Sequence, residues 1–118
     1  MVITVYGIPT CSTVTKARKW LDSRGCTQHF IDFRKTPLCI ETVQDWVARL
    51  GSKAMKNTSG GSYRALGPEK KTWTDAQWIR AFCDDPMLIK RPVIVRDGCA
   101  VQVGFRGTDD ELAERILG

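Results

Sequence analysis

The chain has 118 residues, which is the size of one compact domain. Hydrophobic residues make up 42% and charged residues 26%, a composition that excludes a disordered or fibrous protein. No apolar run approaches the ~18 residues that span a bilayer, and the N-terminus lacks the features of a signal peptide. The sequence therefore predicts a soluble, cytoplasmic protein with no membrane partner.

The chain is basic, with a formal net charge of +5. Such a charge would suit a nucleic acid, but the lysines and arginines are scattered along the sequence rather than clustered. We therefore expect no direct contact with nucleic acid. The charges indicate either a solvated surface or an anion pocket lined by a few of them.

The cysteines are odd in number and irregularly spaced: Cys11, Cys26, Cys39, Cys83 and Cys99. An odd count argues against a disulfide framework, and a single histidine without any CxxC motif argues against a zinc site. We expect no bound metal, and free thiols in a reducing compartment.

The first half of the chain alternates strand and helix signals. Residues 2–6 are a β-branched apolar run that predicts a buried strand, and residues 28–33 suggest a second strand. Between them, residues 14–24 have the spacing of a helix that ends at Gly25. One face of that helix is apolar: Val14, Ala17 and Leu21. Apolar residues mark a further helix before Gly51: Ile40, Val43, Val47 and Leu50.

The middle of the chain is predicted to be a loop followed by a helix. Residues 57–67 contain three glycines and small hydroxyl residues, which favour a loop. Thr74 and Gln77 have the spacing of a capping box that opens a helix through Cys83. Its inward residues are expected to be Trp78, Ile79 and Phe82.

The C-terminal part predicts a hairpin and a last helix. Residues 91–95 form a strand, Asp97-Gly98 is a hairpin turn signal, and residues 100–105 return antiparallel. Thr108 and Glu111 form a second capping box, with Leu112 and Ile116 facing inward.

The order of elements is thus β-α-β, a helical middle, then β-β-α. It predicts an α/β fold of thioredoxin-like (glutaredoxin-like) type, in which a mixed four-stranded sheet carries an α-helical insertion. We expect one domain over residues 1–118. Its core comprises about residues 1–35 and 88–118, and the insertion about residues 36–87.

Cys11 stands at the junction between the first strand and the first helix. Unpaired backbone N–H groups and the positive end of the helix dipole favour thiolate over thiol there. Cys11 is therefore either a reactive nucleophile or simply a small residue in the first helical turn.

The stretch from Tyr6 to Leu21, YGIPTCSTVTKARKWL, resembles the opening of the ArsC/Spx/YffB family of arsenate-reductase-related proteins. Further matching pieces are NTSG at 57–60, YRxL at 63–66, PMLIKRPVIV at 86–95 and VGF at 103–105. The resemblance spans about residues 2–117 and is strongest to the YffB-like branch and to unassigned arsenate reductase family proteins.

This resemblance implies a thiol site built around Cys11. Ser12 and Thr13, with their backbone N–H groups, would hold negative charge, and a cis bond before Pro92 would face the thiol. Without the family, a trans proline at the start of a strand is the expectation.

The resemblance also implies an arginine for anion binding. Arg91 is the best candidate because a guanidinium offers a planar donor fork; Arg64 and Arg106 are weaker ones. The alternative role for Arg91 is a surface ion pair with Asp84 or Asp85.

Two positions depart from the family pattern. Asn57 stands where arsenate reductases carry another arginine, which makes the oxyanion cradle incomplete. Val14 stands where Spx and related branches have the second cysteine of CxxC, so a local disulfide is impossible. A resolving thiol within the chain would have to be Cys26, Cys39, Cys83 or Cys99, and of these Cys39 lies near a helix start.

Two functions follow from the resemblance. The first is a thiol reductase acting on a small oxyanion or thiol substrate through Cys11, with glutathione as co-substrate or glutaredoxin as partner and no bound cofactor. The second is a non-enzymatic, Spx-like regulator that binds RNA polymerase.

Overall fold

One mixed four-stranded sheet organises the computed structural model, which describes residues 1–118. The sheet has the order β2-β1-β3-β4, formed by β1 (Ile3–Gly7), β2 (Gln28–Asp32), β3 (Val93–Arg96) and β4 (Cys99–Val103). β1 pairs parallel with β2 and antiparallel with β3, and β3 pairs antiparallel with β4. The predicted mixed sheet is confirmed.

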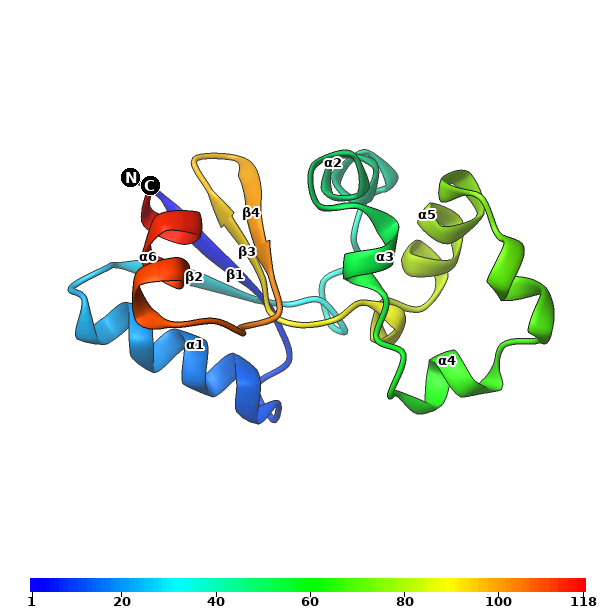
Figure 1. Cartoon of the computed structure of the whole chain (residues 1–118), viewed down its shortest axis with the longest axis horizontal. Coiled ribbons are helices and arrows are strands. Elements are labelled where there is room, and N and C mark those ends of the chain that lie inside the picture. The colour runs from blue at the N-terminus through cyan, green and yellow to red at the C-terminus, as the bar shows by residue number, and fades with distance from the viewer.

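Helices α1 (Ser12–Ser23) and α6 (Asp109–Leu117) cover one face of this sheet (Figure 1). Their apolar side chains join the sheet in one buried cluster: Ile3, Val5, Val14, Ala17, Leu21, Ile94, Leu112 and Ile116. Every residue predicted to face inward on these two helices is buried. Each large aliphatic side chain buried in this way contributes roughly 1.5–3 kcal/mol.

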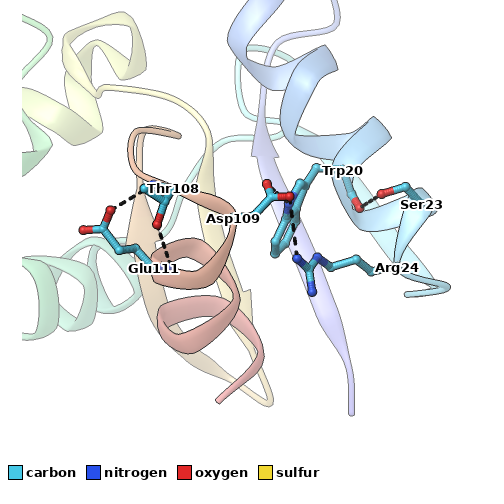
Figure 2. A network of polar contacts seen from close by, with 6 residues as sticks. All are labelled: Trp20, Ser23, Arg24, Thr108, Asp109 and Glu111. Carbon is cyan, nitrogen blue, oxygen red and sulfur yellow. Dashed lines mark hydrogen bonds and ion pairs between the residues drawn. The ribbon is translucent and has the colours of Figure 1, made fainter.

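Polar contacts fasten the start of α6 to the last turn of α1 (Figure 2). Trp20 Nε1 donates to Asp109 Oδ1 at 3.1 Å, and the Arg24 guanidinium lies 3.9 Å from the same carboxylate. Thr108 Oγ1 accepts from the Glu111 N–H at 3.2 Å, while Glu111 Oε1 accepts from the Thr108 N–H at 3.0 Å. The capping box predicted at this position is confirmed.

The chain between β2 and β3 forms a second, helical lobe (Figure 1). It comprises α2 (Ile40–Leu50), α3 (Ser52–Met55), α4 (Gly61–Ala65), the 3₁₀ helix η1 (Pro68–Thr72), α5 (Asp75–Asp84) and the 3₁₀ helix η2 (Pro86–Leu88). Its core is a separate cluster of twelve residues: Ile8, Phe33, Val43, Trp46, Val47, Met55, Trp78, Phe82, Leu88, Ile89, Val93 and Ala100. The capping box predicted at Thr74 opens α5.

The structure adds detail to the sequence expectations in this lobe. The segment 57–67 is mostly loop, as predicted, but it also contains the short helix α4. Ile79 is only partly buried, although Trp78 and Phe82 on the same helix are buried as predicted. The helix that Ile40, Val43, Val47 and Leu50 mark is present as α2, and Ile40 begins it with 46% of its surface exposed.

The β3–β4 turn is built as the sequence predicts. Asp97 has φ +51° and Gly98 has φ +82°, the left-handed pair that a two-residue hairpin requires. None of the helices combines the length and the apolar character that crossing a membrane requires.

Candidate functional site

Cys11 is placed by the close approach of α1 to the end of β1. Gly7 ends β1, and a Cβ on it would lie 2.7 Å from Val14 Cγ2, so only a glycine permits this packing. Cys11 is the N-cap residue of α1, with φ −80° and ψ 122°, but its side chain makes no capping hydrogen bond. The half-buried Cys11 thiol therefore lies free at the N-terminus of α1 and is not used to cap the helix.

A pocket of about 500 Å³ lies beside this thiol. Its lining residues come from four separate segments: Cys11, Thr13, Asn57, Ser59, Gly60, Lys90, Arg91 and Arg106. Three of them are cations and none is a carboxylate, so the pocket favours an anion. A hollow of similar size on α5, between Trp73 and Arg80, contains no thiol among its lining residues.

Arg91 is held by backbone carbonyl groups rather than by an acid. Its Nη1 donates to Met87 O at 3.4 Å and to Ile89 O at 3.3 Å. Arg91 Nε is buried without a hydrogen-bond partner, a state that costs free energy until an acceptor arrives. The alternative ion pair with Asp84 or Asp85 is wrong, because the three ion pairs of the molecule involve other residues.

The structure brings together four of the seven predicted site residues: Cys11, Thr13, Arg91 and Arg106. Ser12 is exposed at the start of α1 and does not line the pocket. Pro92 is buried next to Arg91, and the bond before it is cis, as the resemblance implied. Arg64 lies outside the lining and donates to Ser59 O at 2.7 Å.

Sequence reasoning missed three lining residues: Lys90, Ser59 and Gly60. Lys90 directly precedes Arg91, so the adjacent pair of cations was a signal that could have found it. Gly60 has a packing role, since a Cβ there would meet Asn57 Nδ2 at 2.7 Å. Asn57 itself, noted only as a replacement for an arginine, also lines the pocket.

The other four thiols lie outside the pocket. Cys39 is exposed as the N-cap residue of α2, with its Sγ 3.0 Å from Thr42 Oγ1. Burial raises the pKa of the Cys83 thiol, and the charge of Asp84 raises it further. Nowhere do three or more His, Cys, Asp or Glu side chains converge as a metal site would require.

A family model, that of the ArsC family, matches residues 6–112. This chain belongs to the ArsC family. It is 34% identical over 118 residues to the uncharacterized protein YusI of Bacillus subtilis, an alignment that covers 97% of this chain and 98% of YusI.

Solved ArsC-family structures have the same thioredoxin-like fold. The crystal structure of a "possible arsenate reductase" from Streptococcus mutans superposes with a TM-score of 0.82 at 35% identity and covers 93% of this chain and 96% of its own. A YffB protein superposes with a TM-score of 0.84 at 31% identity, covering 97% and 98%. Relatives of lower identity include proteins named arsenate reductase and proteins named global transcriptional regulator Spx.

Proposed function

We propose that this ArsC-family protein is a glutathione-dependent thiol reductase in which Cys11 is the single nucleophile. One observation carries the proposal: Cys11 is the only thiol lining a pocket that contains three cations and no carboxylate. A thiol in such surroundings is suited to a substrate that presents both a reactive sulfur and negative charge. Glutathione, which carries two carboxylates at neutral pH, meets both conditions.

The reaction proceeds in two thiol–disulfide exchanges. The Cys11 thiolate attacks the glutathione sulfur of a mixed disulfide R–S–S–G, the S–S bond breaks, and the R–S⁻ group leaves and takes up a proton. A second glutathione thiolate then attacks the glutathione sulfur bound to Cys11. Oxidised glutathione departs and the Cys11 thiolate is restored, so that R–S–S–G and one glutathione thiol have become R–SH and oxidised glutathione.

The pocket residues bind and orient the tripeptide. Arg91 uses only Nη1 for its two carbonyl contacts, so the remaining N–H groups of its guanidinium are free to bind a carboxylate. Lys90 and Arg106, both exposed, add positive charge at the rim of the pocket. Thr13 lies on the first turn of α1, where N–H groups without intrahelical partners also attract negative charge.

Arsenate is expected to be a poor substrate. Asn57 contributes a neutral amide to the pocket, and this amide already donates to Met87 O at 3.4 Å and accepts from Ser59 Oγ at 3.2 Å. Removing one charged donor from an anion site costs about 1.5–3 kcal/mol, or one to two decades in affinity.

The test is reduction of bis(2-hydroxyethyl) disulfide by glutathione, followed through glutathione reductase and NADPH. Wild type is expected to turn over, Cys11→Ser to be inactive, and Cys39→Ser, the matched control at another helix N-cap, to match wild type. Activity that persists in Cys11→Ser, or wild-type turnover no faster than background, would refute the proposal. A wild type without turnover that binds RNA polymerase would instead support the Spx-like alternative.

A further inference from the structure

One backbone carbonyl links two residues of the pocket. Met87 O accepts a hydrogen bond from Arg91 Nη1 and another from Asn57 Nδ2, each at 3.4 Å. The guanidinium and the amide therefore share an acceptor. Both bonds are long, so each is weak. Met87 O is one of the two carbonyls that orient Arg91, the other being Ile89 O at 3.3 Å.

The Asn57 side chain is itself fixed by its own loop. Ser59 Oγ donates to Asn57 Oδ1 at 3.2 Å, and Arg64 Nη1 donates to Ser59 O at 2.7 Å. Gly60 leaves the space that the Asn57 amide fills, because a Cβ there would lie 2.7 Å from Asn57 Nδ2. A continuous series of contacts thus runs from Arg64 through Ser59 and Asn57 to Met87 O, one of the two carbonyls that hold Arg91.

The backbone holds the same segments together independently of these side chains. The Asn57 N–H donates to Leu88 O at 2.8 Å, and Lys56 and Ile89 form an isolated antiparallel bridge. Removing the Asn57 side chain should therefore leave the loop docked and the fold intact. Because the backbone bonds do not involve the Asn57 side chain, a substitution of Asn57 tests the role of that side chain alone.

We propose that Asn57 and Arg64 are positioning residues that aim Arg91 at the anionic part of the substrate, an inference that rests on the proposed function for what Arg91 binds. Asn57 acts on Arg91 through Met87 O, and Arg64 acts one step further back through the Ser59 carbonyl. Neither residue needs to touch the substrate. An amide in place of an arginine is then a change of role, from binding the anion to orienting the arginine that binds it.

The kinetic test is a double-mutant cycle with the bis(2-hydroxyethyl) disulfide and glutathione assay. Asn57→Ala is expected to raise the KM for glutathione about fivefold, the equivalent of one hydrogen bond of about 1 kcal/mol, with kcat nearly unchanged. In an Arg91→Ala background the same substitution should change KM by less than twofold. An equal rise in both backgrounds, or no rise in wild type, would overturn the proposal.

A second measurement is independent of turnover. The Nε–Hε NMR signal of Arg91, assigned by its loss in Arg91→Lys, reports the order of the buried Nε. Asn57→Ala and Arg64→Ala are expected to increase its exchange with water, whereas the control Arg80→Ala, which removes the same charge from α5, should not. An unchanged signal in Asn57→Ala refutes positioning even in an active enzyme. A changed signal in a protein without reductase activity leaves positioning supported and refutes the proposed function.

Discussion

Substituting Gly7 by alanine should disturb the first turn of α1 and the thiol that precedes it. The new Cβ would lie 2.7 Å from Val14 Cγ2 and 3.4 Å from Val14 Cγ1, and the first distance is too short for two carbon atoms. Val14 is 1% exposed and β-branched, with one strongly preferred rotamer in a helix, so its side chain cannot turn aside. The helix must move instead, and Cys11 lies one turn before Val14.

The magnitude follows from the type of clash. Forcing one methyl group into a packed core costs about 1–3 kcal/mol, so Gly7→Ala is expected to lower the free energy of unfolding in urea by that amount. Val14→Ala alone should cost about 2 kcal/mol for two lost methyl groups and the resulting cavity. In the double variant, the new methyl group at position 7 occupies the space that Val14→Ala vacates. Gly7→Ala should then lower the free energy of unfolding by less than half as much as it does in wild type.

The assay is equilibrium unfolding of the four proteins of this cycle, with the rate of Cys11 alkylation measured on each. Gly61→Ala is the matched control, because a Cβ at Gly61 meets only Arg64 Nη2, at 4.0 Å. It should not destabilise the protein or alter Cys11. If the costs of Gly7→Ala and Val14→Ala simply add, the contact does not set the position of α1 and the reasoning is wrong.

Three further predictions concern the α6 capping box and the thiols outside the pocket. Thr108→Ala should destabilise the protein by about 1 kcal/mol in urea, because it removes the side-chain acceptor of the α6 capping box. Hydrogen bonds from Thr108 hold the pKa of Glu111 below its usual 4.5. At neutral pH, wild type should therefore be more stable to urea than Glu111→Gln. That difference should vanish as the pH falls through the lowered pKa; a difference that persists in acid contradicts it. Iodoacetamide at neutral pH should label exposed Cys39 faster than Cys83, whose pKa is raised by burial, as peptide mass spectrometry would show; equal rates would contradict this.

The parts of the fold that local chemistry specifies were predictable from the sequence. Both capping boxes, at Thr74 and Thr108, open the helices expected of them, because the two residues that form each box lie within one turn. The Asp97-Gly98 turn is likewise set by residues that tolerate positive φ. The apolar spacing of α1 identified its buried face because the helix is long enough for the period to repeat.

Helix α4 could not be predicted in this way, because distant contacts stabilise it. A five-residue helix is too short to form alone, and its sequence begins with glycine. Tyr63 stacks on Trp78 with ring centroids 6.3 Å apart, Lys70 lies over the Tyr63 ring, and Arg64 reaches back to Ser59 O. For the same reason the pocket lining was only partly predictable. Asn57 reaches Met87 O across thirty positions of sequence, and Arg91 contacts the same carbonyl.

Under the proposed function, the absence of a thiol at position 14 explains why a cationic pocket beside Cys11 is useful. Position 14, where related branches place a second cysteine, is buried here against Gly7 and belongs to the core of α1 and the sheet. Cys11 therefore has no second thiol in its own pocket, and the thiol that completes the exchange must come from solution. Lys90, Arg91 and Arg106 raise the local concentration of an anionic thiol over that of a neutral one. A cationic lining is thus what a one-cysteine site of this kind needs, because it attracts the second thiol that the chain itself does not supply.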